Sequence, residues 1–350
     1  MIRRAITTAG IVAAAAVSFR ALGRRGARRL LEAPRTTPDE AALGPALDAL
    51  GGEVVRLRSR DGLRLAARWL PRSGEAGDWV PDPHEAILLL HGYSGSIVPD
   101  LVESGPFLRG TAGVLGLDFR GHGESDDGPT TFGLLEVEDI GGALDWLGER
   151  GITRVALVGT SMGGISAIAA VAVLGDGSLS SADGDPMAPR DPAPPPRPAI
   201  VAVVAESVPP ELAGPIAARL RGPARRFIAA RLFDAAAASL GADPRATEPA
   251  RVIGLVEPVP LLLIHGEADT TVPVEDGRHL ASLAGQSAEH WIVPGAGHSA
   301  GHATAPDAYE QRVIAFLRAA LLEARGSGPI IAAPGPPAGD PTLRAIDMED

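Results

Sequence analysis

The sequence predicts an α/β protein with a mostly parallel, doubly wound sheet, an N-terminal antiparallel hairpin and a small helical lid. Residues 53–60 alternate in polarity, meet the turn Asp61-Gly62 and resume the alternation over 64–70, which predicts the hairpin. Short apolar runs separated by helix-length segments follow, and such runs are typical of parallel strands buried on both faces. The segment 207–258 is too long for one crossover helix, so we expect a lid there.

The elements after the hairpin follow a regular order. The apolar runs predict six strands, at residues 86–90, 113–119, 155–158, 199–205, 260–264 and 289–293. Helices are expected at residues 99–109, 134–150, 162–174, 274–284 and 306–324. Within the lid, residues 221–240 form an arginine-rich pattern that favours a helix.

Composition divides the chain into one domain, 51–325, and two flanking regions. Residues 175–198 are rich in Pro, Gly, Ser and Asp and are expected to be a flexible insert, and residues 326–350 a disordered tail. The leader, residues 1–50, contains an apolar stretch at 5–17, shorter than the ~20 residues that span a bilayer. Three alternatives stay open: a cleaved signal peptide, a membrane anchor or surface helix, and a leader helix without membrane role. The expected location is membrane-associated or exported, otherwise cytoplasmic.

The residue types present restrict the chemistry. The net charge of −11 argues against a nucleic-acid partner. Every basic residue is arginine, which excludes Schiff-base chemistry and a lysine general base. The chain contains no cysteine, so it offers neither thiol nucleophiles nor thiolate metal ligands. The candidate nucleophiles are therefore hydroxyls and carboxylates.

One serine stands in a sequence typical of an exposed nucleophile. Gly159-Thr-Ser161-Met-Gly163 lies between a predicted strand and a predicted helix, the context that a nucleophile elbow requires. The glycines leave room for a strained backbone at the serine, and the helix N-terminus contributes positive potential near a developing anion. The alternative is a glycine-rich turn without chemical meaning.

Four further motifs follow other predicted strands. They are His91-Gly-Tyr-Ser-Gly95, Asp118-Phe-Arg-Gly-His-Gly-Glu-Ser125, Ile264-His-Gly-Glu-Ala-Asp269-Thr-Thr-Val-Pro273 and Pro294-Gly-Ala-Gly-His298. With the serine turn, these motifs resemble those of the α/β-hydrolase family, in the family's order, over about residues 53–324. The branch most similar contains small esterases and monoacylglycerol-lipase-like or serine-aminopeptidase-like hydrolases.

The resemblance implies a Ser-His-Asp triad of Ser161, His298 and Asp269, in the chain order expected for this fold. A serine needs a base to take its proton, and histidine suits that task near neutral pH. Glu206 at the end of a strand and Glu267 on the acid's own loop are alternatives to Asp269. His302 is the alternative to His298. Asp118 is expected to brace its own loop through Arg120.

The oxyanion of the reaction needs two backbone N–H donors. Met162, the residue after the nucleophile, is expected to supply one, and by resemblance Tyr93 supplies the other. The expected activity is hydrolysis of a small acyl ester without metal or organic cofactor, with peptide or thioester hydrolysis as alternatives. A non-enzymatic scaffold is a further alternative. Five lid arginines favour an acidic substrate or a lipid surface, unless they only form a solvated face: Arg219, Arg221, Arg225, Arg226 and Arg231.

Overall fold

A computed structural model describes residues 23, 25–33, 40–73, 77–93, 95–175 and 197–326. Most of the predicted insert (176–196), the predicted tail from residue 327 onward and the apolar stretch 5–17 lie outside the described residues. No helix within the described ranges is both long enough and apolar enough to cross a membrane.

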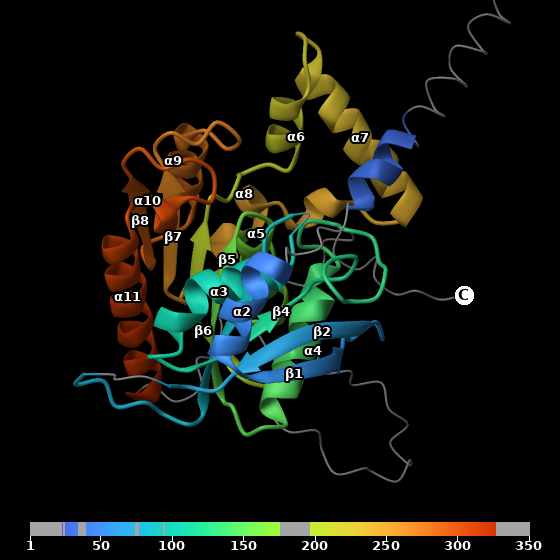
Figure 1. The fold of residues 1–350 in the computed structure, drawn as a ribbon. Helices are drawn as coiled ribbons and strands as arrows, with labels where there is room; N and C mark the ends of the chain where they lie inside the picture. The colour runs from blue at the N-terminus through green and yellow to red at the C-terminus, as the bar shows by residue number, and fades with distance from the viewer. Residues whose placement is uncertain are drawn as a thin grey trace, which may run out of the picture.

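Eight strands form one sheet in the order β1-β2-β4-β3-β5-β6-β7-β8 (Figure 1). The strands are β1 (Glu53–Arg58), β2 (Arg64–Leu70), β3 (Glu85–Leu90), β4 (Gly113–Leu117), β5 (Arg154–Thr160), β6 (Ala199–Glu206), β7 (Leu261–Gly266) and β8 (Ala288–Val293). β2 pairs antiparallel with both β1 and β4, and all other pairs are parallel. The predicted fold class is confirmed.

Helices cover both faces of the sheet. They are α2 (Glu40–Leu50), α3 (Ile97–Leu108), α4 (Glu136–Gly148), α5 (Met162–Leu174), α6 (Ala213–Arg219), α7 (Arg225–Leu240), α8 (Pro249–Val252), α9 (Val274–Leu283), α10 (Gly301–Thr304) and α11 (Pro306–Gly326). Two 3₁₀ turns, η1 (Pro244–Thr247) and η2 (Ile253–Leu255), flank α8. Helices α2, α3 and α11 share one buried cluster with the sheet, and α4, α5 and α9 share the other.

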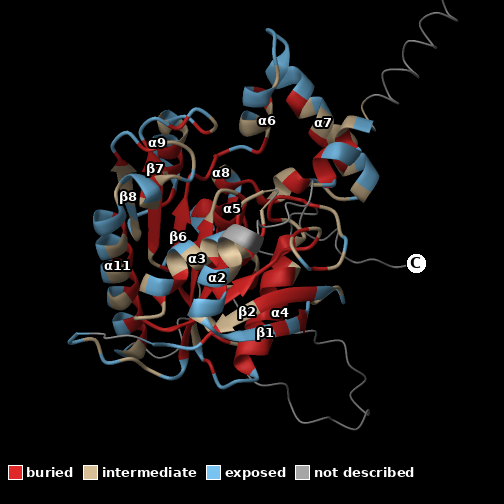
Figure 2. Ribbon diagram, viewed as in Figure 1, coloured by how far each residue is buried: buried red, intermediate tan, exposed pale blue. Residues whose placement is uncertain are grey.

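The apolar runs follow from burial on both faces. In β3, Ala86, Leu88 and Leu90 belong to the cluster beneath α4 and α5, whereas Ile87 and Leu89 belong to the cluster beneath α3 and α11. A strand buried on both sides needs apolar residues at every position, because successive side chains point to opposite faces. The central strands and α5 are accordingly buried along their length (Figure 2).

The lid follows β6 and consists mainly of α6 and α7, which project beyond the carboxyl ends of the strands (Figure 1). Residues 25–31 form a short helix that packs against α7, with Ala27 and Leu31 in one small buried cluster with Ala236. Leu30 belongs to the buried cluster beneath α4 and α5, and Leu47 of α2 belongs to the cluster beneath α3 and α11. The packed part of the chain therefore begins before residue 51, within the segment that composition assigns to the leader.

A cluster of charged groups, which we call the clamp, lies at the amino ends of the central strands, away from the lid. Glu85, at the start of β3, has no exposed side-chain surface and lies 2.7 Å from Nη2 of Arg325 at the end of α11. Arg154, at the start of β5, donates from Nε to the same carboxylate at 3.2 Å. A buried carboxylate requires such partners, because loss of hydration is otherwise uncompensated. The clamp fixes the last helix to the centre of the sheet.

Candidate active site

Ser161 occupies the strained position that the glycine pattern predicts. It lies between the last residue of β5 and the first residue of α5, with φ 53° and ψ −112°. Although Ser161 stands at the N-cap of α5, its side chain forms no capping hydrogen bond. Its amide donates to the carbonyl of Glu206 at 2.8 Å, which ties the turn to the neighbouring strand. The hydroxyl is therefore free of the helix and is presented above the sheet.

Gly163 permits the close approach of α5 to β3 at this turn. A Cβ added at Gly163 would overlap the backbone carbonyl groups of Leu90 and His91. Because backbone atoms cannot move aside as a flexible side chain can, we expect Gly163→Ala to lower the free energy of unfolding by roughly 2–4 kcal/mol. Urea unfolding followed by circular dichroism measures the change.

Gly214→Ala is the matched control for this substitution. Gly214 lies in α6, and a Cβ there meets nothing within 4 Å. This control is expected to leave stability unchanged or to raise it by up to about 1 kcal/mol, because alanine favours a helix over glycine. Equal stability of the Gly163→Ala and Gly214→Ala proteins would contradict the packing argument.

The structure brings Ser161, His298 and Asp269 together from three separate strand ends. Nε2 of His298 lies 3.1 Å from Oγ of Ser161, and Nδ1 of His298 lies 2.8 Å from Oδ2 of Asp269. The three residues are far apart in sequence, but their loops follow β5, β7 and β8 at the same edge of the sheet. The arrangement has the geometry of a nucleophile, a base and the group that orients the base.

Asp269 is held as a carboxylate. Its side chain is fully buried, and its Oδ1 accepts hydrogen bonds from the amides of Thr271 and Val272 at 2.8 and 2.9 Å. Burial alone would raise the pKa of Asp269, but the hydrogen bonds from His298 and from these amides outweigh it and lower the pKa below its usual value. Asp269 is thus charged at neutral pH and fixes Nδ1 of His298 as the protonated nitrogen.

Met162 and the loop of Tyr93, the two predicted oxyanion donors, are positioned by α5 and by the turn after β3. Met162 begins α5, so its N–H belongs to the first turn, where amides lack intrahelical partners. Gly92, which precedes Tyr93, approaches the elbow so closely that an added Cβ would lie 3.7 Å from Cβ of Ser161. The Tyr93 ring stacks on Phe132 at 5.3 Å between centroids, so its side chain is a packing group.

Glu206 contacts the histidine loop without contacting His298. Its Oε1 accepts from the amide of Gly301 at 2.8 Å, and its Oε2 accepts from the hydroxyl of Tyr309 at 2.8 Å. Burial raises the pKa of Glu206, and these two hydrogen bonds oppose the rise. Glu206 therefore positions the loop that carries His298, while the contact with the imidazole is made by Asp269.

Ser207 and Tyr309 support the same loop and were not predicted from the sequence. The Ser207 hydroxyl accepts from the amide of Ser299, the residue after His298, at 3.0 Å. Both serines have positive φ, 55° and 54°, a conformation that non-glycine residues seldom adopt. The only sequence feature that could have indicated a role for Ser207 is its position directly after β6. Tyr309 lies within α11, where the apolar pattern indicates core packing and no contact with Glu206.

The other candidate residues lie outside this hydrogen-bonded chain. His302 bonds to Glu103 and Glu310, each at 3.0 Å. Glu267 accepts from the amide of Gly295 at 3.1 Å and is exposed. Neither residue forms a hydrogen bond with the imidazole of His298, which instead bonds to Asp269 and Ser161.

His91 has a structural role at the base of the predicted oxyanion loop. Burial, together with the neighbouring His122, lowers the pKa of His91 to about 3, so the ring is neutral. Its Nδ1 lies 2.7 Å from the carbonyl oxygen of Gly92, and its Nε2 accepts from the amide of Phe119 at 3.1 Å. A neutral ring with Nδ1 protonated satisfies both bonds and ties the loop after β3 to the loop after β4.

Asp118 and Arg120 brace their loop separately, which corrects the expectation that one acts through the other. Asp118 accepts from the amides of Ile97 and Glu124 at 2.7 and 3.0 Å. The buried guanidinium of Arg120 instead pairs with Asp139 and Asp61, at 2.8 and 2.7 Å. The sequence predicted a brace in this loop, but it did not reveal that α4 and the hairpin turn supply the partners of Arg120.

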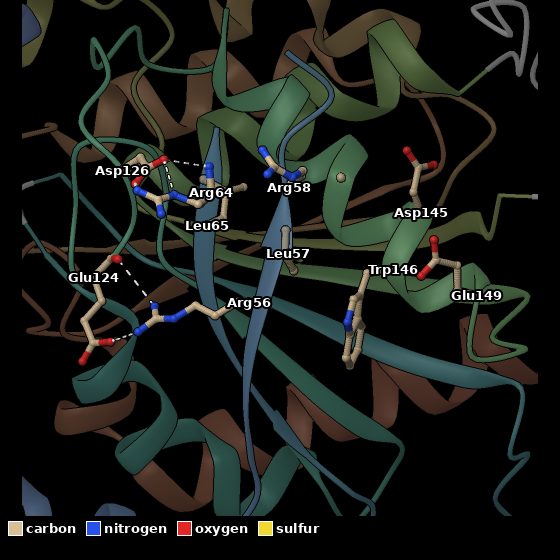
Figure 3. A pocket seen from close by; sticks show the side chains of 11 residues that line it. Arg56, Leu57, Arg58, Arg64, Leu65, Glu124, Asp126, Asp145, Trp146 and Glu149 are labelled. Atoms are coloured by element: carbon tan, nitrogen blue, oxygen red, sulfur yellow. Dashed lines mark hydrogen bonds and ion pairs between the residues drawn. The ribbon is translucent and has the colours of Figure 1, made fainter. Parts of the chain in front are cut away.

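A depression of about 730 Å³ lies elsewhere, between the β1–β2 hairpin and α4 (Figure 3). Arg56 and Arg64 on its rim pair with Glu124 and Asp126, and Trp146 forms one wall. Its lining residues include neither the serine nor the histidine described above. Because Arg56 and Arg64 already have partners and the lining lacks a nucleophile beside a base, we place the candidate active site at Ser161. Within the described ranges, no group of three or more carboxylates and histidines is arranged to hold a metal ion.

Comparison with known proteins identifies the family. A model of the alpha/beta hydrolase family matches residues 87–312, which include the serine turn, the Asp269 loop and the His298 loop. The chain belongs to the α/β-hydrolase family.

The relatives include the uncharacterized protein YfhR of Escherichia coli O157:H7, 26% identical over 288 residues that cover 81% of this chain and 86% of YfhR. YfhR of Salmonella typhimurium is 25% identical over 290 residues, with coverage of 81% and 87%. Two solved structures share the fold. The Pyrococcus furiosus esterase Pf2001 superposes with a TM-score of 0.58 at 21% identity, covering 83% of this chain and 100% of that one. An alpha-beta hydrolase from Vibrio vulnificus gives 0.60 at 18% identity, with 84% and 93% covered.

Proposed function

We propose that the protein is a serine hydrolase that cleaves carboxylic esters, with Ser161 as nucleophile, His298 as general base and Asp269 as the group that orients the imidazole. The observation that supports this proposal is the continuous chain of two hydrogen bonds from Ser161 through His298 to Asp269. A serine hydroxyl at its ordinary pKa is a weak nucleophile, and a base within hydrogen-bond reach activates it.

In the proposed first half-reaction, Oγ of Ser161 attacks the ester carbonyl carbon while Nε2 of His298 takes the hydroxyl proton. The carboxylate of Asp269 accepts from Nδ1–H and stabilises the imidazolium that forms. The carbon–oxygen bond of the ester then breaks, and Nε2 returns the proton to the departing alcohol. The products of this half-reaction are the free alcohol and an acyl ester on Ser161.

In the second half-reaction, His298 takes a proton from water, and the resulting hydroxide equivalent attacks the acyl carbon. Expulsion of Oγ, which receives the proton from His298, releases the carboxylic acid and restores the enzyme. The amides of Met162 and Tyr93 are proposed to bind the oxyanion in both steps. Such preorganised donors act where negative charge develops and are worth several kcal/mol in serine hydrolases.

The charges of the lid favour an ester over a peptide with a free amine. Recognition of a substrate ammonium group would need a carboxylate without another partner. Three of the five acidic residues between 207 and 258, Asp234, Asp243 and Glu248, instead pair with lid arginines, at 2.9, 2.9 and 3.3 Å, and seven arginines outnumber the five acids. An ester is therefore preferred to a peptide with a free amine, the substrate of an aminopeptidase.

Covalent labelling and substrate comparison together test this function. A fluorophosphonate probe is expected to form one adduct, which peptide mapping places on Ser161. The same preparation is expected to hydrolyse p-nitrophenyl acetate and butyrate with a kcat/KM at least about 100-fold above that for alanine p-nitroanilide. An adduct with faster anilide cleavage would replace the ester assignment by a peptidase. No adduct and no turnover on folded protein would favour the non-enzymatic scaffold.

A further inference from the structure

The connection between α6 and α7 forms an exposed, positively charged end of the lid, which we call the lid tip (residues 218–228). Apart from Leu220, every residue in it is exposed (Figure 2). It contains no acidic residue and four arginines, Arg219, Arg221, Arg225 and Arg226. In the described part of the lid, ion pairs involve Arg231, Arg245 and Arg251, and none involves an arginine of the lid tip.

The lid tip also exposes two large apolar side chains next to these charges. Phe227 is 60% exposed and Ile228 is 43% exposed. They occupy successive positions in the first turn of α7, directly after Arg225 and Arg226. Apolar side chains flanked by cations are the combination that binds the interface of an anionic bilayer, where acyl chains and headgroup phosphates lie within a few ångströms.

The N-terminal segment reaches the same helix. Residues 25–31 lie alongside α7, where a Cβ added at Gly26 would overlap the Leu232 side chain and Ala27 shares a buried cluster with Ala236 (Figure 1). The sequence that precedes this helix contains the apolar stretch 5–17 and Arg20. Residues 25–31, which include Arg25, Arg28 and Arg29, and the lid tip are thus distant in sequence but both lie at α7.

The net charge of the whole chain favours an orientation in which the lid tip faces an anionic surface. The net charge is −11, so an anionic surface repels most of the protein and attracts the lid tip. Each arginine near such a surface contributes a favourable increment, and single weak contacts reinforce one another when they lie on one rigid element. We propose that the lid tip docks on an anionic lipid membrane through Phe227, Ile228 and its arginines.

The docking is independent of the chemistry at Ser161, and it places the lid between the bilayer and the candidate active site. Burial raises the pKa of Asp276 in α9, and the charge of Arg226 opposes this rise. Arg226 therefore already acts on a neighbouring carboxylate. Substitution of Arg226 would therefore also change the interaction with Asp276. We choose Arg221 and Arg225 for substitution, because loss of their charge affects binding to the lipid surface alone.

Vesicle sedimentation of the full chain tests the proposal. The wild type is expected to bind phosphatidylcholine vesicles containing about 30% phosphatidylglycerol at least roughly tenfold more tightly than pure phosphatidylcholine, and to be released by salt. Arg221→Gln combined with Arg225→Gln should lower the partition coefficient roughly 10- to 30-fold. Phe227→Ser combined with Ile228→Ser should lower it by about tenfold or more.

Exposed positions far from the lid supply matched controls. Arg58→Gln with Arg72→Gln removes two exposed charges near the β1–β2 hairpin, and Leu322→Ser removes an apolar side chain that is 59% exposed on α11. These controls should bind within about twofold of the wild type. Phe227→Trp adds a fifth tryptophan, and the difference between its emission and that of the wild type should shift to shorter wavelength with anionic vesicles.

Two results would overturn the proposal. If the lid-tip variants bind as tightly as the wild type, the N-terminal segment alone accounts for any membrane binding. The second result is a wild type that does not bind anionic vesicles but uses Phe227 and Ile228 to self-associate or to bind a soluble acidic protein. The lid tip would then be a protein interface.

Discussion

Ser161→Ala is expected to lower kcat/KM for p-nitrophenyl butyrate by at least about 10⁴-fold. The substitution removes the atom that forms the acyl bond, and no other hydroxyl is recorded at hydrogen-bond distance from Nε2 of His298 in the described residues. The fold should persist, because the Ser161 side chain makes no capping bond and its amide still donates to Glu206. Initial rates and thermal unfolding of the two proteins give the comparison.

A serine removed elsewhere on the surface controls for loss of a hydroxyl alone. Ser282 is exposed on α9, where its hydroxyl donates to the carbonyl of His279 at 2.6 Å. Ser282→Ala should retain activity within about twofold of the wild type. Activity of Ser161→Ala close to that of this control would mean that turnover does not proceed through Ser161.

Asp269→Asn is expected to lower kcat by about 10³- to 10⁴-fold while KM changes little. The carboxylate accepts the proton of His298 Nδ1 and thereby leaves Nε2 free to accept from the serine. An asparagine amide can donate to Nδ1, which reverses the tautomer and removes the basic lone pair that faces Ser161. The charge that balances the imidazolium is lost as well. Steady-state kinetics over a series of substrate concentrations separates the two parameters.

Glu206→Gln provides the contrast, because Glu206 is a second buried acid that ends a strand and contacts the histidine loop. The glutamine amide oxygen can still accept from the amide of Gly301, so the histidine loop should stay in place. The expected loss in kcat is less than about tenfold. A loss at Glu206→Gln that exceeds the loss at Asp269→Asn would identify Glu206 as the acid of the triad.

Most of the fold was predictable because its strands are buried on both faces. A run such as Ile87–Leu90 leaves few alternatives to a central parallel strand, and the limits of α5 are fixed by the glycines before it and its uniform apolar composition. α2 was not predicted: it contains Pro45, and its packing on α3 is a tertiary property that the local pattern does not encode.

The candidate site also has a part that the sequence predicts and a part that it does not. Ser161, Asp269 and His298 follow strand ends in glycine-rich loops, so their meeting follows from the parallel order of the sheet. Their assignment as catalytic residues stays a prediction until the variants are measured. The Ser207–Ser299 bond and the Tyr309–Glu206 bond depend on side chains from different elements meeting at defined angles, and no spacing in the sequence reports such a meeting.

The clamp at Glu85 has a consequence for how the chain is made. The residue belongs to a central strand that leaves the ribosome early, yet Arg325, which donates to it at 2.8 and 2.7 Å, is 240 residues further along the chain. Arg154 arrives first and supplies one weaker partner. Until α11 has been synthesised, the amino ends of the strands must therefore either keep this carboxylate hydrated or bury it with only Arg154 as a partner. A nascent chain halted before α11 should expose those strand ends to chaperones even though all eight strands have already been synthesised.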